Sequence, residues 1–385
     1  MLKKPKLIRI TTVPLSLRNL LSGQMLFMKN NGFDVIMISA DSKERTEIMA
    51  NEQCEHIIVP MMRKITLISD LKCLWQLIKI FRKEKPDIVH SHTPKAGLLG
   101  MIAAKICRVP VRIHTLAGLP LMTATGLKRN ILQLTERVTY IAATNVWPNS
   151  FSLKKYLLNN KLINPKKLYV IQKGSSNGII LNKYKSEAID VKDIEALKVK
   201  FGLDKKFYNL LFVGRIVKDK GIIELLDAFE RVQEMYKNVR LILVGDFEQH
   251  LNPIPQQYID KINNNPQIIF TKWVNNVIPF YHFANLIVFP SHREGFPNAL
   301  LQAGAFQIPV VCSNIMGNVD LIKETTGQCF KVGNANDLFE KIVFALTNND
   351  EIMRRSQNLY TVVVTQYDNR IIMQSILDKY NDLLN

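Results

Sequence analysis

One pattern runs through the whole chain: short runs of β-branched and other apolar residues alternate with longer amphipathic stretches. In the first half, the strand-like runs lie at 6–13, 34–40, 56–60, 87–92, 111–116, 140–147 and 167–173. In the second half, they lie at 209–216, 239–246, 267–273, 286–291, 309–313 and 329–333. Strands that alternate with helices predict parallel sheets covered by helices on both faces.

Helical patterns fill most of the intervals between these runs. They fall near 16–31, 69–85, 95–107, 128–139, 150–159, 221–236, 255–264, 275–283, 297–307 and 336–347. The stretch 174–190 breaks the alternation, because it opens with the turn sequence GSSNG and continues with polar residues that show no periodicity. A linker there divides the 385 residues, which are too many for one ordinary core, into two domains.

The predicted fold class is therefore α/β, with two doubly wound, Rossmann-like domains that face a cleft. We place the first domain at 1–185 and the second at 186–365. Residues 350–384 show no strand signal and indicate one or two long helices. The last helix, over 366–385, can pack back on the first domain.

The composition is that of a globular protein, with 47% hydrophobic and 22% charged residues, and no apolar run is long enough to span a bilayer. The basic start MLKKPK does not open a signal peptide, because Arg9 and Arg18 interrupt the apolar stretch and no small-residue cleavage site follows. Five dispersed cysteines without a CxxC pair indicate buried thiols in a reducing compartment. We therefore expect a cytoplasmic protein.

The net charge of +18 is unevenly distributed. Residues 1–190 hold 30 lysines and arginines against 12 acidic residues, whereas residues 191–385 hold 21 of each. Such asymmetry favours an anionic partner: a nucleic acid, an acidic membrane surface or a phosphorylated substrate. We do not expect nucleic-acid binding, because the chain shows neither interleaved aromatic and basic residues nor a recognised binding module.

Several nucleotide and metal motifs are absent from the sequence. There is no G-x-G-x-x-G after the first strand, no P-loop, no H-E-x-x-H and no D-x-D. We therefore expect no bound metal and no cofactor. A phosphorylated substrate would have to be neutralised by cationic side chains and helix N-termini.

Two stretches of the second half offer such groups. GRIVKDKG (214–221) follows the first strand of that half and carries three cations between two glycines. SHREGFPNALLQ (291–302) places Glu294 just before a helix-like run, and Pro297 suits the first helical position. Both stretches follow strands, so we expect cations, a carboxylate and a helix N-terminus at the carboxyl edge of one sheet.

These residues resemble the family 4 glycosyltransferases, which are retaining enzymes of the GT-B fold. The family's Glu-x7-Glu motif stands here as Glu294-GFPNALL-Gln302, so its second acid is replaced by an amide. Other segments look like the subgroup that builds capsule, O-antigen or glycan repeat units on a polyprenyl-diphosphate lipid: 11–35, 90–104, 109–121 and 173–179. Two features depart from the family pattern: the loop TTVPLSL lacks paired glycines, and Lys272 stands where the family commonly has glycine.

The resemblance implies transfer of a sugar, with retention of configuration, from a nucleotide-diphosphate sugar to a polyprenyl-diphosphate-linked saccharide. A UDP-sugar is the favoured donor. The first domain would serve the acceptor and the second the nucleotide sugar. The implied donor-binding residues are Arg215, Lys220, Gly295, Phe296, Pro297, Asn298 and Gln302. Glu294 and His114 would be the catalytic residues, and His92 and Lys95 would contact the acceptor.

One alternative from a different class is a sugar-nucleotide 2-epimerase, because such isomerases share the two-domain architecture. The basic loop together with Glu294 favours transfer. The basic first half and the uncharged loop 116–127, which ends at Lys128 and Arg129, further predict peripheral binding to the anionic cytoplasmic face of the inner membrane.

Overall fold

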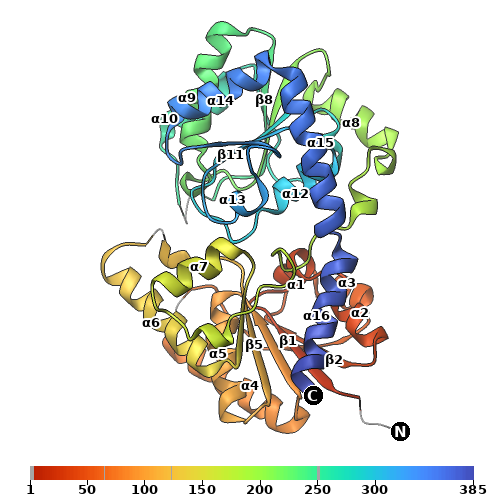
Figure 1. Cartoon of the computed structure of the whole chain (residues 1–385), viewed down its shortest axis with the longest axis vertical. Coiled ribbons are helices and arrows are strands. Elements are labelled where there is room, and N and C mark those ends of the chain that lie inside the picture. Colours follow the sequence, from red (N-terminus) through yellow and green to blue (C-terminus); the bar gives the residue numbers. More distant parts are fainter. Residues whose placement is uncertain (1–3, 65, 123, 249–251) are drawn as a thin grey trace. The chain divides into compact units, whose positions relative to one another are not determined.

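The computed structural model describes residues 4–64, 66–122, 124–248 and 252–385. The chain divides into two compact units (Figure 1). Unit 1 comprises Met1–Asn177 and Asn369–Asn385, and unit 2 comprises Gly178–Asp368. The sequence placed the first boundary at residue 185, whereas Ile179 already belongs to unit 2, where its amide donates to the carbonyl of Tyr367 at 2.8 Å.

Unit 1 contains a six-stranded, all-parallel sheet in the order β3-β2-β1-β4-β5-β6. The strands are β1 (Lys6–Ile10), β2 (Asp34–Ser39), β3 (Glu55–Ile58), β4 (Ile88–His92), β5 (Val111–Leu116) and β6 (Asn145–Pro148). The helices are α1 (Pro14–Leu20), α2 (Gln24–Asn30), α3 (Arg45–Glu52), α4 (Leu67–Glu84), α5 (Pro94–Ile106), α6 (Gly126–Ala142), α7 (Phe151–Asn159) and the C-terminal α16 (Asn369–Leu384).

Alternate side chains of the unit 1 strands build two cores. Ile8 and Ile10 pack with residues of α4, α5 and α6 on one face of the sheet. Leu7 packs with residues of α1, α2 and α16 on the other face. The last helix of the chain thus completes the unit that the first strand begins, and Figure 1 shows α16 beside α2.

Unit 2 contains a second six-stranded parallel sheet, in the order β12-β11-β10-β7-β8-β9. The strands are β7 (Tyr208–Val213), β8 (Val239–Val244), β9 (Ile268–Phe270), β10 (Leu286–Phe289), β11 (Val310–Ser313) and β12 (Gln328–Phe330). The helices are α8 (Val191–Phe201), α9 (Ile222–Met235), α10 (Gln256–Asn264), α11 (Ile278–Tyr281), α12 (Asn298–Ala305), α13 (Asn318–Leu321), α14 (Ala335–Thr347) and α15 (Asn349–Gln366).

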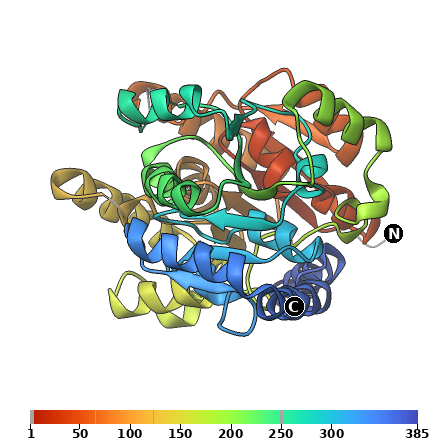
Figure 2. The same cartoon turned by 90° about the horizontal axis from the view of Figure 1, so that it is seen from above.

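The unit 2 strands are buried on both faces, as parallel strands covered by helices should be. Leu210 and Phe212 pack with α9 and α14, whereas Leu211 between them packs with α12 and α15. Helices flank both sheets in Figure 1 and Figure 2. The predicted class of two doubly wound α/β domains is confirmed.

Several elements differ from the sequence prediction. The helix expected at 16–31 is two helices, because Gly23 adopts a left-handed φ of 79° between them. The strand expected at 167–173 is absent: Leu168 forms one isolated bridge with Val146, and Gln172 has a φ of 48°, which ends any extended run. The strand expected at 140–147 starts only at Asn145, because α6 continues to Ala142.

Three helices were not predicted: α3, α8 and α13. The C-terminal stretch, for which one or two helices were expected, holds the two helices α15 and α16. Among the described residues, no helix is both long enough and apolar enough to cross a bilayer.

Close backbone contacts fix the loops at the carboxyl edge of the unit 2 sheet. Gly221 ends the loop after β7 with a φ of 70°, and a Cβ built there would lie 2.1 Å from the carbonyl oxygen of Pro290, just after β10. Gly245 directly follows β8, and a Cβ built on it would lie 1.9 Å from the carbonyl oxygen of Gly214. Only glycine permits these approaches, so the loops after β7, β8 and β10 are held together by their backbones.

Replacing Gly221 tests this packing against a matched glycine of the same unit. Gly202→Ala introduces only a left-handed conformation, because nothing lies within 4 Å of its added Cβ, and it should cost about 1–2 kcal/mol. Gly221→Ala adds a clash with the backbone of Pro290, so its cost should exceed that of Gly202→Ala by about 1–3 kcal/mol. Urea unfolding measures both values. Equal costs would show that the two loops are not in contact.

Candidate active site

The candidate site in unit 2 begins from the parallel pairing of β7 with β10. Leu210 pairs with Leu286 and Leu211 with Ile287, so both strands end at the same edge of the sheet. The basic loop 214–221 continues from β7, and the loop 291–297 continues from β10. Ligands of doubly wound sheets bind at this carboxyl edge.

Asp219 joins these two loops. Its carbonyl accepts a hydrogen bond from the amide of His292 at 2.8 Å, and its carboxylate accepts one from Nε of Arg293 at 3.1 Å. The acidic residue of the basic loop therefore serves as an anchor. The neighbouring Lys220 is free to point toward the loop after β10.

Lys220 and Glu294 form an ion pair between Nζ and Oε1. Both side chains are shielded, with exposed fractions of 17% and 16%, and the ammonium also lies 5.6 Å from the centre of the Phe289 ring. The structure thus brings together a predicted donor-binding cation and the predicted catalytic carboxylate, 74 positions apart in the chain.

Arg215 does not join this pair. Its Nη1 lies 2.6 Å from Oε2 of Glu248, which follows β8, and its side chain is 45% exposed. The two cations predicted to hold a diphosphate therefore each have a carboxylate partner. An arriving phosphate would have to compete with Glu248 for Arg215 and with Glu294 for Lys220.

The start of α12 differs in one detail from the prediction. Pro297 is the N-cap, with extended backbone (φ −87°, ψ 96°), and Asn298 is the first helical residue. Phe296 is buried and packs against the Tyr367 ring, 5.2 Å between centres. Gly295 is also buried, and a Cβ on Gly317 would lie 2.7 Å from its carbonyl oxygen. Of these four predicted donor residues, Asn298 has the exposed side chain.

Gln302 lies in α12 with both ends of its amide engaged. Its Oε1 accepts a hydrogen bond from the Tyr281 hydroxyl at 2.7 Å, and its Nε2 donates to the Tyr184 hydroxyl at 3.0 Å. Burial raises the pKa of Tyr281 well above its usual range, so this hydroxyl stays a donor. The role predicted for Gln302, holding a ribose, stays a prediction.

A second ionic contact at this edge was not singled out from the sequence. His292 Nε2 lies 2.8 Å from Oε1 of Glu224 in the first turn of α9. The hydrogen bond to Glu224 raises the pKa of His292. Burial of Glu224 opposes its ionisation, yet the hydrogen bond from His292 leaves the carboxyl pKa below its usual value. His292 directly follows the buried Ser291, and only its position beside Glu294 could have drawn attention to it.

In unit 1, His114 lies on β5 inside the layer between the sheet and α5. Its Nδ1 lies 3.0 Å from the Ser91 hydroxyl, and a Cβ on Gly97 would lie 2.4 Å from its ring. Burial lowers the pKa of His114 to about 4, so the imidazole is neutral at neutral pH. The catalytic role predicted for His114 stays a prediction.

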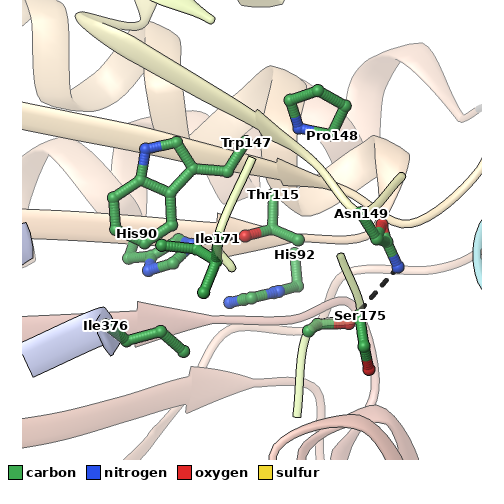
Figure 3. Close-up of a pocket in the computed structure, with 10 residues that line it drawn as sticks. His90, His92, Thr115, Trp147, Pro148, Asn149, Ile171, Ser175 and Ile376 are labelled. Atoms are coloured by element: carbon green, nitrogen blue, oxygen red, sulfur yellow. Dashed lines mark hydrogen bonds between the residues drawn. The ribbon is translucent and has the colours of Figure 1, made fainter. Parts of the chain in front are cut away.

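His92 and Lys95, the two predicted acceptor residues, occupy different environments. Lys95 forms an ion pair with Asp70, with Nζ–Oδ distances of 2.7 and 2.8 Å. His92 ends β4 and borders a pocket that Figure 3 shows, with Asn149 and Thr115 on its wall. The structure therefore places His92 at a cavity and ties Lys95 to a carboxylate.

Sequence reasoning missed the buried residue behind this pocket. Arg9 lies on β1, between apolar neighbours in the sequence KLIRI, and it donates to the side chains of Gln24, His92 and Tyr380. A charged residue inside an apolar strand was the only available signal. Its partners lie up to 371 positions away and could not be inferred from the sequence.

Among the described residues, no group of three or more His, Cys, Asp or Glu side chains is arranged to hold a metal ion. The charged groups at the carboxyl edge of unit 2 are suited to an anionic, hydroxyl-rich ligand. Cations there can neutralise phosphates, and Glu294 can accept hydrogen bonds from hydroxyls.

Comparison with known proteins agrees with this chemistry. Residues 193–361 match the model "Glycosyl transferases group 1", and residues 18–150 match "Glycosyl transferase 4-like". The chain is 36% identical over 393 residues to the capsular polysaccharide biosynthesis glycosyltransferase CapM of Staphylococcus aureus, covering 100% of this chain and 98% of that protein. The chain belongs to the group 1 glycosyltransferases and is a glycosyltransferase.

Two further similarities extend this assignment. The chain is 27% identical to the UDP-Gal:alpha-D-GlcNAc-diphosphoundecaprenol alpha-1,3-galactosyltransferase of Escherichia coli, covering 93% of this chain and 91% of that one. A glycosyltransferase structure from Rickettsia africae superposes with a TM-score of 0.80 at 19% identity, covering 100% and 99% of the two chains. The fold is accordingly GT-B.

The His292–Glu224 contact predicts a pH dependence of stability. The raised pKa of His292 gives stability that is present below its unfolded pKa and is lost as pH rises through the folded pKa. The lowered pKa of Glu224 gives stability that is lost as pH falls through the folded pKa. The free energy of unfolding, measured in urea, should therefore be higher for the wild type than for His292→Gln. The difference should be largest between about pH 4.5 and 6.5.

His282→Gln is the matched control, because burial lowers the pKa of His282. Protonation of His282 lowers the stability of the folded state. His282→Gln should therefore raise the free energy of unfolding most at low pH, which is the opposite of the effect expected for His292→Gln. A pH-independent difference between the wild type and His292→Gln would show that His292 and Glu224 do not interact as ions.

Proposed function

We propose that this glycosyltransferase moves a sugar from a UDP-sugar to a saccharide linked to a polyprenyl diphosphate, during assembly of a surface polysaccharide. The names of the relatives support this proposal: one acts in capsular polysaccharide biosynthesis, and another transfers galactose from UDP-Gal to GlcNAc-diphosphoundecaprenol. The basic character of unit 1 suits an acceptor that carries a diphosphate.

The observation that carries the proposal is the shielded Lys220–Glu294 pair beside the start of α12. A donor diphosphate offers Lys220 a more highly charged partner than one carboxylate does. When Lys220 turns to the phosphate, Glu294 is released to accept hydrogen bonds from hydroxyls of the sugar. The ion pair would thus hold both groups ready in the empty enzyme and exchange partners on binding.

Transfer then depends on stabilising the leaving diphosphate. Negative charge develops on it as the acceptor hydroxyl approaches the same face of the sugar, and the configuration is retained. Lys220, Arg215 and the first amides of α12 would meet that charge. Because these groups are cationic or dipolar, we propose that the reaction needs no metal, and a chelator should leave its rate unchanged.

The function is tested with purified enzyme and GlcNAc-diphosphoundecaprenol as acceptor. UDP-galactose, UDP-glucose and UDP-N-acetylgalactosamine are supplied in turn, and the lipid product is analysed by mass spectrometry and by NMR of its new linkage. Retention requires an α-linked product from these α-linked donors. A parallel incubation without acceptor examines the epimerase alternative, which requires the sugar nucleotide itself to isomerise.

Removing the Lys220 charge should weaken the donor through its phosphates. Lys220→Gln loses a charged hydrogen bond and leaves Glu294 unpaired against the phosphate, so the affinity for UDP should fall about ten- to a hundredfold. Uridine, which has no phosphate, should bind as before. Lys218→Gln, an exposed residue of the same loop, should change UDP affinity by less than about twofold. Equal losses for UDP and uridine would contradict a phosphate contact.

We further propose that unit 1 attaches the enzyme peripherally to an anionic membrane. Of the twenty exposed large apolar side chains among the described residues, fourteen lie in unit 1. On α6 they form one stripe at helical spacing: Leu127, Ile131, Leu134, Val138 and Ile141. On α4 they are Leu67, Ile68, Leu71 and Trp75. Exposed cations, including Lys128 and Arg137, accompany the stripe, a combination that suits an anionic lipid surface.

The apolar stripe predicts vesicle binding that depends on particular leucines. Leu127→Gln with Leu134→Gln should lower the affinity for anionic vesicles at least about tenfold, because a buried leucine contributes about 1.5–3 kcal/mol. Val191→Gln with Val199→Gln, two exposed positions of unit 2, is the control and should have no effect. Flotation on vesicles with and without phosphatidylglycerol, at low and high salt, measures the apolar and the electrostatic contributions to binding. Equal binding of all three proteins would exclude α6 as the contact.

A further inference from the structure

Arg9 carries a buried positive charge whose hydrogen-bond partners are all neutral. The residue is 1% exposed. Its Nη2 lies 2.6 Å from Oε1 of Gln24 and 2.9 Å from Nε2 of His92, and its Nη1 donates to the hydroxyl of Tyr380 on α16. Arg9 forms no ion pair with a described residue, although its charge acts at longer range on the buried carboxyl of Glu52. A buried charge without a direct partner of opposite sign costs several kcal/mol, so its presence here needs a physical reason.

The guanidinium fixes the direction of the hydrogen bonds around it, because it can only donate. Nε2 of His92 must therefore accept, and the proton of this neutral imidazole must lie on Nδ1. Burial and the charge of Arg9 lower the pKa of His92 well below its usual range, which keeps the ring neutral. Two chains of hydrogen bonds, here called branches, start from Arg9. The first branch ends at the Nδ1–H of His92, which is a donor.

A second branch runs through Tyr380 and His90. The Tyr380 hydroxyl accepts from Arg9 and so donates to Nδ1 of His90, 2.6 Å away. Nε2 of His90 then carries the proton and donates to the Thr115 hydroxyl at 2.7 Å. The Thr115 oxygen is an acceptor in this bond, and its own proton is available to another partner. This branch also ends as a donor.

Both branches end at the same pocket. His92 and Thr115 line it together with Asn149 at the carboxyl ends of β4, β5 and β6, and Figure 3 shows these side chains around it. The pocket is small, with room for about one water-sized group, and it opens to solvent. Oδ1 of Asn149, a residue only 6% exposed, is buried and has no hydrogen-bond partner among the described residues.

Two donors and one unpaired acceptor define the group that fits. A phosphate oxygen accepts hydrogen bonds but has none to give, so it would leave Oδ1 of Asn149 unpaired and would face its partial negative charge. A hydroxyl can accept from His92 and Thr115 and donate to Asn149. The space is about that of one water molecule, so a single hydroxyl group fits in it.

We propose that this pocket binds one hydroxyl group of the acceptor sugar, and that Arg9 is a positioning residue that orients both donors toward it. The proposal rests on the proposed transfer to a saccharide acceptor. It assigns a specificity subsite to His92, Thr115 and Asn149, and it explains why the C-terminal helix supplies Tyr380 to unit 1.

Two substitutions of His92 separate the pocket donor from the bond to Arg9. In His92→Asn, the amide nitrogen can take the place of Nδ1, so the donor is kept and the contact with Arg9 is lost. In His92→Gln, the longer side chain can accept from Arg9 through its oxygen, but the donor at the Nδ1 position is lost. The KM for GlcNAc-diphosphoundecaprenol should rise about tenfold in His92→Gln and less than about threefold in His92→Asn. The KM for the donor should not change in either.

Deoxygenated acceptors identify the hydroxyl. Analogues of the acceptor, each lacking one hydroxyl of its sugar, are assayed with the wild type and with His92→Gln. One analogue should raise the KM of the wild type about tenfold and that of His92→Gln hardly at all, because the bond is already gone. Thr115→Val should resemble His92→Gln, and Thr115→Ser, which keeps the hydroxyl, should resemble the wild type.

Arg9→Met examines the positioning role. It should raise the acceptor KM in the wild type but add little in His92→Gln combined with Thr115→Val, where both donors are absent. If Arg9→Met does not fold, the His92 pair and the analogues still decide the question. Similar KM values for His92→Asn and His92→Gln, or equal effects of every deoxy analogue on both enzymes, would overturn the subsite. Failure of the wild type to glycosylate the lipid acceptor would instead overturn the proposed function.

Discussion

The parallel pairing of β7 with β10 is the constraint on which the candidate donor site depends. It ends both strands at one edge, where the backbone of Gly221 lies against that of Pro290 and the amide of His292 donates to the carbonyl of Asp219. Lys220 and Glu294 can therefore meet without either side chain having to hold the loops together. Their ion pair can open toward a ligand while the loops stay in place, because Asp219 and the glycine contact hold them independently.

Cations near the two candidate sites are used in two different ways in this protein. In unit 2, Lys220 and Arg215 are paired with carboxylates, so an incoming anion exchanges with a charge that is already present. In unit 1, Arg9 forms no ion pair with any described residue, and its hydrogen bonds polarise neutral groups instead. A paired cation suits a ligand that brings its own charge, such as a diphosphate. A cation enclosed by neutral groups instead fixes the direction of the hydrogen bonds around it, and here the chains of hydrogen bonds end as donors that suit a hydroxyl.

The sequence predicted what depends on local pattern. Runs of β-branched residues identified all twelve strands of the described residues, and the glycines and the proline that follow two of these runs identified the loops that carry Lys220 and Glu294. Prediction from the sequence failed where the structure depends on contacts between residues far apart in the chain. The run at 167–173 is apolar because it covers a core, and apolarity alone does not distinguish that from a strand. The role of Arg9 could not be predicted from the sequence, because it depends on a hydrogen bond to Tyr380 at the other end of the chain.

The charge asymmetry takes on a physical meaning once the units are separated. Unit 2, with the candidate donor site, has equal numbers of cationic and acidic residues, so a nucleotide sugar would be held by particular side chains rather than by a general field. Unit 1 holds the whole excess of positive charge and most of the exposed apolar side chains. At physiological ionic strength the field of surface charges decays within about 8 Å, so this excess acts on whatever touches unit 1 itself. The proposed transfer, from a donor dissolved in water to an acceptor anchored in an anionic bilayer, accounts for this division of charge between the two halves of one enzyme.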